Sequence, residues 1–264
     1  MKICGIDFFT KGPELVPLLA HGGLVQVPSG PGLADDLRDK PSYGRALLEA
    51  DYVIPDSGLM VMLWNYMVRP AGARKLERYS GLRLLRDLLP RQEVKAKGAS
   101  FWIMPSEEDR ERNLRWLKLE GHEVTLEDCY IAPYYRNRLA PDGAVEDPVL
   151  LALIEKREPR YVFVNVGSGV QEQLGWYLRK NLSYTPAILC TGAAISFLTG
   201  GQANIPPWAD RFHLGWLFRI LRDPTRFGKR YFNALKLIPM MLRCRDRLPE
   251  AVARPLRELY GMEV

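Results

Sequence analysis

An aspartate, Asp56, follows an apolar run in the segment Tyr52–Leu63, YVIPDSGLMVML. The apolar run predicts a buried strand over Tyr52–Ile54, and the residues after Gly58 predict an apolar helix. Ligands of open α/β sheets gather at the carboxyl ends of the strands, so Asp56 could serve there as a general base. Its carboxylate could equally cap the helix that follows. The residues by themselves leave both roles open.

A turn of small residues, Gly167-Ser168-Gly169, follows the apolar run Tyr161–Val166, and a helix is predicted to begin at once. Small residues let the backbone approach a diphosphate, whose charge is favoured by a helix N-terminus. Gln171 and Glu172 lie in the first turn of this helix, where they could bind ribose or sugar hydroxyls. Glu172 occupies the third glycine position of a dinucleotide fingerprint, so the motif is incomplete. An ordinary tight turn with capping side chains remains an alternative.

Two further segments carry groups suited to an anionic ligand. Arg78 precedes a Ser-Gly turn in Glu77–Gly81, and a guanidinium binds phosphate through two hydrogen bonds. Gly192 lies in the small-residue turn after the apolar run Ile188–Cys190. The alternatives are an exposed ion-pairing arginine and close packing of a helix on the sheet.

The basic residues are concentrated at the C-terminal end. The chain has a net charge of +6, and Arg211–Arg257 contains twelve Lys or Arg against three acids. From Pro207 to Phe232, aromatic and aliphatic residues alternate with arginines at helical spacing. The residues of this stretch with a predicted role are Trp216, Arg219, Arg226 and Arg230. Such helices bind anionic membrane surfaces, or they pack on their own domain or on a second subunit.

Short apolar runs alternate with longer amphipathic segments, a pattern that predicts an α/β fold with a mostly parallel, Rossmann-like sheet flanked by helices. The predicted strands are Leu24–Val27, Tyr52–Ile54, Ser100–Met104, Val124–Ile131, Tyr161–Val166 and Ala187–Cys190. Predicted helices start after Ser106, span about Asp147–Lys156, and run from Gly169 through Lys180. Beyond Pro206-Pro207 only basic helix is predicted. We therefore expect an α/β body over residues 1–205 and a helical appendage over residues 206–264.

Several classes of protein are disfavoured by what the sequence lacks. The four cysteines and three histidines are widely separated, which argues against a zinc site or a disulfide framework. The charged N-terminus does not resemble a signal peptide, and no apolar run approaches the roughly 20 residues of a membrane span. The sequence has no P-loop, no G-x-S-x-G and no D-x-D triplet. Charge on a leaving group would then be offset by arginines and helix N-termini.

Taken in order, the segments resemble the WecG/TagA/CpsF glycosyltransferase family over residues 3–232. The similar segments are Ile54–Gly58, Glu77–Gly81, Gly167–Glu172 with Trp176, Gly192–Gly200, Pro206–Trp208, Trp216–Arg219, Pro224–Arg226 and Arg230–Tyr231. The chain departs from the family pattern at Val27–Pro31, at Ser57 and at Arg83. It is therefore identified as a divergent member.

The resemblance implies an inverting, metal-independent transfer of a sugar from a UDP-sugar to a polyprenyl-diphosphate-linked saccharide, without a cofactor, in bacterial cell-surface polysaccharide synthesis. Asp56 would be the base, and Arg78, Gly192 and the segment Gly167–Glu172 would bind the donor. The basic tail would dock the enzyme peripherally on the inner face of the cell membrane and complete the acceptor site. Whether the protein forms a homo-oligomer is left open, and nucleic acid is not expected as a partner. The alternatives are a non-catalytic membrane adaptor and another Rossmann-like enzyme, an oxidoreductase or a methyltransferase.

Overall fold

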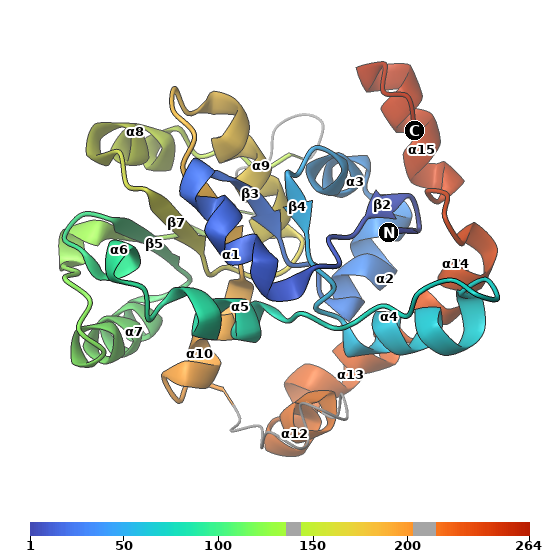
Figure 1. The fold of residues 1–264 in the computed structure, drawn as a ribbon, viewed down its shortest axis with the longest axis horizontal. Helices are drawn as coiled ribbons and strands as arrows, with labels where there is room; N and C mark the ends of the chain where they lie inside the picture. The colour runs from blue at the N-terminus through green and yellow to red at the C-terminus, as the bar shows by residue number, and fades with distance from the viewer. Residues whose placement is uncertain (136–143, 203–214) are drawn as a thin grey trace.

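The computed structural model describes residues 1–135, 144–202 and 215–264, and its centre is one parallel sheet covered by helices on both faces (Figure 1). The strand order is β4-β3-β8-β7-β5-β6, and each neighbouring pair is parallel. The strands are β3 (Gly23–Gln26), β4 (Tyr52–Val53), β5 (Ser100–Met104), β6 (Cys129–Ile131), β7 (Tyr161–Val164) and β8 (Ala187–Cys190). The predicted Rossmann-like α/β class is confirmed.

The strands that the sequence predicts are those of the sheet, with small differences at their ends. β6 contains only the last three residues of the predicted Val124–Ile131. Leu126–Asp128 instead forms a 3₁₀ turn, because the Asp128 carboxylate accepts hydrogen bonds from the backbone N–H and the hydroxyl of Thr125. A small antiparallel hairpin of β1 (Lys2–Ile3) and β2 (Ile6–Asp7) was not predicted, since its strands are too short to show a period.

One face of the sheet is covered by α1 (Leu15–Leu18), α5 (Gly81–Leu88), α6 (Gln92–Lys95), α7 (Glu107–Leu119) and α10 (Ile195–Leu198). The helix α5 shows why: Ser80 caps it, and Leu84, Leu85 and Leu88 form one buried stripe. The other face is covered by α8 (Pro148–Arg157) and α9 (Val170–Asn181). The predicted helices after Ser106, over 147–156 and over 169–180 thus correspond to α7, α8 and α9.

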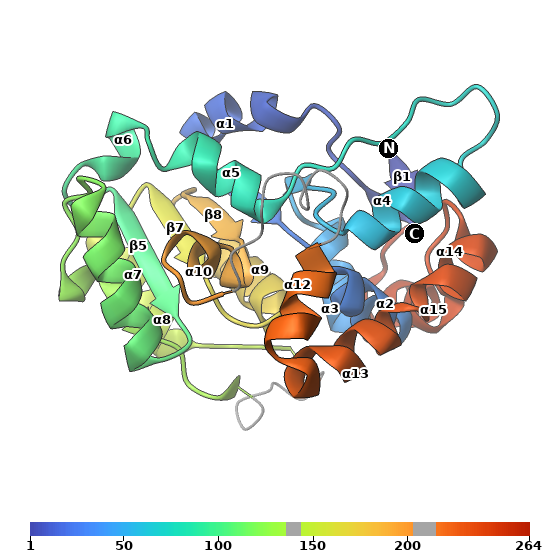
Figure 2. The same cartoon turned by 90° about the horizontal axis from the view of Figure 1, so that it is seen from below.

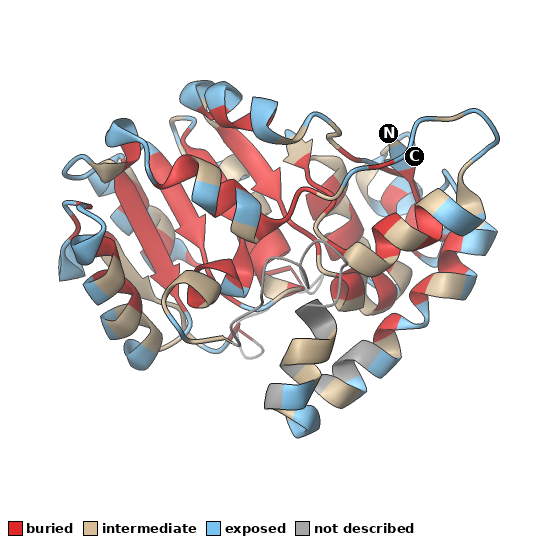
Figure 3. Cartoon of the chain, turned by 60° about the horizontal axis from the view of Figure 1, so that its bottom comes forward, coloured by how far each residue is buried: buried red, intermediate tan, exposed pale blue. Residues whose placement is uncertain are grey.

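Beyond the β4 edge lies a second apolar cluster, built by α2 (Gly30–Asp39), α3 (Pro41–Leu48), α4 (Gly58–Leu63) and the π turn η3 (Trp64–Val68). The C-terminal segments are α12 (Gly215–Arg222), α13 (Pro224–Ala234), α14 (Leu237–Cys244) and α15 (Glu250–Tyr260). Met240 and Met241 of α14 are buried in this cluster. Figure 3 shows the buried inner faces of α14 and α15.

The helix α15 is held to α3 and α9 by stacked side chains. The Arg45 guanidinium lies 3.8 Å from the ring centre of Trp176 and 4.2 Å from that of Tyr260. Val252 and Leu256 are fully buried. The last two helices therefore share the core of the body, which the division at residue 206 did not anticipate. That predicted boundary itself lies outside the described residues.

Candidate functional site

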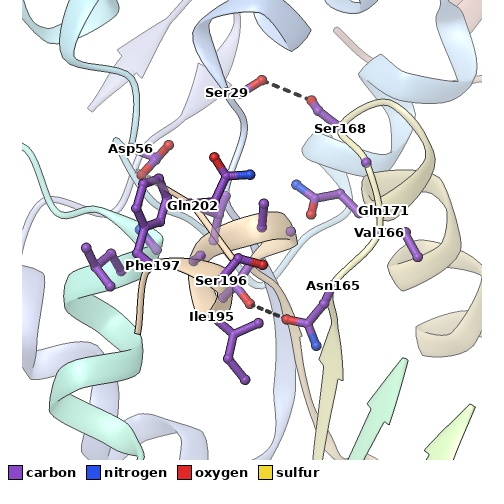
Figure 4. Close-up of a pocket in the computed structure, with 18 of the residues that line it drawn as sticks. Ser29, Asp56, Asn165, Val166, Ser168, Gln171, Ile195, Ser196, Phe197 and Gln202 are labelled. Carbon is purple, nitrogen blue, oxygen red and sulfur yellow. Dashed lines mark hydrogen bonds between the residues drawn. The ribbon is translucent and has the colours of Figure 1, made fainter. Parts of the chain in front are cut away.

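A cavity of about 460 Å³ lies at the edge of the sheet where the parallel strands end (Figure 4). Five of the six strands contribute a residue that directly or nearly follows them: Val27, Asp56, Pro105, Asn165 and Thr191. From β5 the chain continues to β6 on one side, and from β7 it continues to β8 on the other. The cavity therefore occupies the topological switch point at which α/β proteins bind ligands.

Asp56 lies in this cavity, and its side chain is 29% exposed. Its Oδ1 accepts a hydrogen bond of 3.1 Å from the backbone N–H of Gly81, the first residue of α5. Ser57 caps α4, since its hydroxyl accepts from the backbone N–H of Met60 at 3.2 Å. The alternative in which Asp56 caps the following helix is therefore wrong. Its carboxylate is placed where it can meet a ligand.

Arg78 is held beside this aspartate. Its Nε donates a hydrogen bond of 2.6 Å to the backbone carbonyl of Asp56, and one terminal nitrogen lies 4.0 Å from Asp56 Oδ1. Arg78 also lines the cavity. The structure thus brings together the two charged residues that the sequence singled out near the end of β4.

The opposite wall is the turn after β7. Gly167, Ser168 and Gln171 line the cavity. The Ser29 hydroxyl donates to Ser168 Oγ at 3.1 Å, which joins this turn to the start of α2. Gly32 packs so closely on Ser168 that a Cβ there would overlap its hydroxyl. The two loops form one tightly packed surface.

Gly169 and Glu172 lie behind that wall. Gly169 has φ +91°, and a Cβ there would lie 2.8 Å from Asp36 Oδ2. Glu172 is fully buried, and this burial raises the pKa of its carboxyl group to about 7. Its predicted contact with a ligand does not fit this geometry, because both carboxylate oxygens already accept hydrogen bonds from the turn and from Gln171.

Gly192 lines the cavity after β8 and has φ +56°, a conformation that favours glycine. A Cβ there would lie 2.8 Å from Gln171 Oε1. The small residue that the sequence assigned to this turn is therefore needed for the neighbouring side chain to fit.

The sequence analysis missed the contribution of α7. Glu108, Asp109, Arg112 and Asn113 line the cavity, and Arg112 pairs with Asp109. Asn113 is buried and accepts a hydrogen bond of 2.8 Å from the Thr199 hydroxyl. The signal was available, since α7 follows a predicted strand. The expected capping of this helix by Ser106 is also seen, since its hydroxyl accepts from the backbone N–H of Asp109.

In the described ranges, four helices of eight or more residues begin at the cavity: α2 after Ser29, α5 after Ser80, α7 after Ser106 and α9 after Gly169. Ser29, Ser80 and Gly167 line it. Each helix N-terminus carries a partial positive charge. The site thus combines the partly exposed Asp56 carboxylate with helix N-termini that attract anions.

The predicted tail residues lie on α12 and α13, and α13 packs on α2 (Figure 2). The side chains of Trp216, Arg219, Arg226 and Arg230 lie outside the described part of the structure. Within residues 1–135, 144–202 and 215–264, no helix is long and apolar enough to cross a membrane. In the same ranges no three His, Cys, Asp or Glu side chains are grouped as metal ligands would be.

Comparisons with a family model and with known proteins all indicate the same family of glycosyltransferases. The sequence model described as "Glycosyl transferase WecG/TagA/CpsF family" matches residues 19–251. A protein of Bacillus spizizenii, named N-acetylglucosaminyldiphosphoundecaprenol N-acetyl-beta-D-mannosaminyltransferase, is 25% identical over 89% of this chain and 85% of its own length. A protein of the same name from Staphylococcus aureus is 26% identical over 37% of this chain and 36% of its own.

Proposed function

Since the chain belongs to the WecG/TagA/CpsF family of glycosyltransferases, we propose that it moves a sugar from a UDP-sugar to a polyprenyl-diphosphate-linked saccharide. The Bacillus spizizenii relative is named for such an acceptor, N-acetylglucosaminyldiphosphoundecaprenol, and the similarity covers most of both chains. The family assignment favours a glycosyltransferase over the oxidoreductase or methyltransferase alternatives. The product would enter the synthesis of a bacterial cell-surface polysaccharide.

The observation that carries the proposal is the division of the cavity into two walls. Asp56 follows β4 and the Gly167 turn follows β7, and β3 and β8 lie between these strands. Three inter-strand spacings of about 4.8 Å separate the two walls by about 14 Å. This width suits a donor whose diphosphate rests on one wall while its sugar reaches the other.

In the proposed reaction, Asp56 removes the proton from a hydroxyl of the acceptor. The oxygen then forms a bond to the anomeric carbon of the donor while the bond from that carbon to UDP breaks. Attack opposite the leaving UDP inverts the configuration. The N-termini of α2 and α9 offset the negative charge that develops on UDP, and the Arg78 guanidinium adds a positive charge from the Asp56 side of the cavity. No metal ion or cofactor takes part in the proposed steps.

The experiment is UDP release from a panel of UDP-sugars, with and without a polyprenyl-diphosphate saccharide, for the wild type and for Asp56→Asn. We expect acceptor-dependent release from one donor, lost in the variant and unaffected by EDTA. Release that EDTA abolishes would overturn the metal-independent mechanism. A folded protein that binds liposomes but turns over no donor would favour the adaptor alternative.

The tail is proposed to bind an anionic membrane surface and the diphosphate of the acceptor, with the enzyme peripheral on the inner face of the membrane. Its charge supports this role, since α12 and α13 carry Arg219, Arg226 and Arg230. Because α14 and α15 belong to the core, deleting all residues after 206 would disturb the body. Replacing the three arginines by glutamine should lower both vesicle binding and turnover. Normal values of both would make these helices purely structural, and analytical ultracentrifugation would test self-association.

A further inference from the structure

We call the wall formed by the turn after β7 and by Gln171 the donor wall. The carboxylate of Glu172 lies behind it and accepts hydrogen bonds from its residues. Its Oε2 accepts from the backbone N–H of Gly169 at 2.7 Å, and its Oε1 accepts from Gln171 Nε2 at 2.9 Å. The Ser168 hydroxyl lies 3.4 Å from Oε1. All three partners donate. An ionised carboxylate accepts from all three without needing an acceptor of its own, whereas a protonated one must also find an acceptor for its proton.

This arrangement fixes the orientation of the Gln171 amide. Gln171 is 3% exposed, and its nitrogen is engaged by Glu172. Its carbonyl oxygen is buried and finds no hydrogen-bond donor in the part of the chain that the structure describes. Figure 4 shows the side chain reaching from α9 toward the cavity that it lines. An acceptor without a donor is costly in a protein interior, so a ligand that supplies the hydrogen gains affinity.

The charged and polar groups around Glu172 determine how its carboxylate is stabilised. Asp36 of α2 disfavours the negative charge of Glu172, and Glu172 in turn helps burial to raise the pKa of the Cys190 thiol on β8. Gln26 of β3 donates to the Glu172 backbone carbonyl at 2.8 Å. Lys40 pairs with Asp36 rather than with Glu172. In the described residues the Glu172 carboxylate is stabilised by hydrogen bonds and not by an ion pair.

We propose that Glu172 is a positioning residue of the donor site, which orients the Gln171 amide so that its carbonyl oxygen accepts a hydrogen bond from an N–H or O–H of the nucleotide sugar. The inference rests on the proposed function, because it assigns the ligand of this wall to a UDP-sugar. Glu172 does not touch the ligand. It determines which end of the Gln171 amide does.

The experiment is calorimetric titration at pH 8 with UDP and with the UDP-sugar that the release assay selects. The proteins are the wild type, Glu172→Gln, Gln171→Ala and the double variant. A matched control is Glu49→Gln, since Glu49 is a partly buried carboxylate that pairs with Arg45 and Lys180 away from the cavity.

We expect each single variant to weaken binding at least tenfold, and the double variant to lose no more than the stronger single one. The control should stay within twofold. Weakening of both ligands would place the donated hydrogen on uridine, and weakening of the UDP-sugar alone would place it on the sugar. Additive losses, or a Glu172→Gln variant that binds both ligands as the wild type does, would overturn the inference. A wild type that binds neither ligand would overturn the proposed function instead.

If Glu172→Gln does not fold, a second measurement tests the inference without that variant. The wild type and Gln171→Ala are titrated with UDP from pH 8 to pH 6. A protonated Glu172 would donate to Gln171 and turn its amide, so wild-type affinity should fall with the pH more steeply than that of Gln171→Ala. The titration of the UDP phosphate affects both proteins equally, so the comparison of their affinities removes its contribution. Parallel curves would contradict the positioning role.

Discussion

The two walls of the cavity differ in how they use a carboxylate, Asp56 on one and Glu172 behind the other. Asp56 is partly exposed, and both described contacts of its carboxylate reach Oδ1, so Oδ2 can meet an acceptor. Glu172 is fully buried and uses both oxygens to hold the backbone and side chains around it. The sequence placed both near a ligand. The comparison teaches that burial decides which carboxylate reacts and which one shapes the site.

The largest expected effect is that of Asp56→Asn. Removing a general base should lower turnover by about 10²–10⁴-fold. UDP affinity should stay within twofold, because the Asp56 carboxylate is proposed to contact the acceptor hydroxyl and not UDP. The measurement is single-turnover kinetics beside calorimetry. Asp51→Asn is the matched control, since Asp51 lies at the opposite end of the same strand, where it accepts from the Leu24 backbone N–H. Equal losses of turnover in both variants would contradict the assignment of Asp56 as the base.

The second prediction concerns the effect of the buried Glu172 carboxyl group on the free energy of unfolding. Burial raises the pKa of Glu172 from 4.5 to about 7, so folding favours its protonated form. The contribution is present below pH 4.5 and is lost as the pH rises through 7, a change of about 3 kcal/mol. The neutral Glu172→Gln should therefore gain stability over the wild type between pH 5 and pH 8. Urea unfolding at both values measures this difference.

The stability of the variant must be compared with that of the wild type at each pH, because His122 changes the stability of both proteins with pH in the opposite direction. Burial lowers the pKa of His122 to about 4, so its contribution is present above pH 6.5 and is lost as the pH falls through 4. Both proteins contain His122, and subtraction removes its effect. A Glu172→Gln variant that is less stable than the wild type at pH 8 would mean that the carboxylate supports the fold itself.

The third prediction tests whether Arg78 acts through its hydrogen bond to Asp56 or through its charge alone. Arg78→Lys keeps the charge but loses the Nε hydrogen bond to the Asp56 carbonyl. A hydrogen bond to a charged group contributes about 1.5–3 kcal/mol, so kcat/KM should fall roughly 10–100-fold. Arg78→Ala should lose more. Arg86→Ala on the exposed side of α5 is the control. If lysine restores full activity, the role of Arg78 is charge alone.

Much of the fold could be predicted because strand signals are local. Ser100–Met104 and Ala187–Cys190 are found with the predicted bounds, and Asp56 and the Gly167 turn lie at one cavity because parallel strands end at one edge. The burial of Glu172 could not be predicted, since it depends on α2 packing against the turn. The packing of α14 was missed for a similar reason, because a basic helix with one apolar face suits a core or a membrane equally.

The smallest expected effect separates backbone strain from site geometry on the donor wall. Gly192→Ala and Gly200→Ala both place a Cβ at positive φ, +56° and +79°, and each should cost about 1 kcal/mol of stability. A Cβ at 192 meets Gln171 Oε1 at 2.8 Å, whereas at 200 it meets nothing within 4 Å. Only Gly192→Ala should therefore weaken UDP binding, by roughly fivefold to tenfold, about 1–1.4 kcal/mol of affinity. Calorimetry with both variants measures it. Equal UDP affinity in the two would show that Gln171 can shift without loss, and that the donor wall tolerates the movement that its packing argues against.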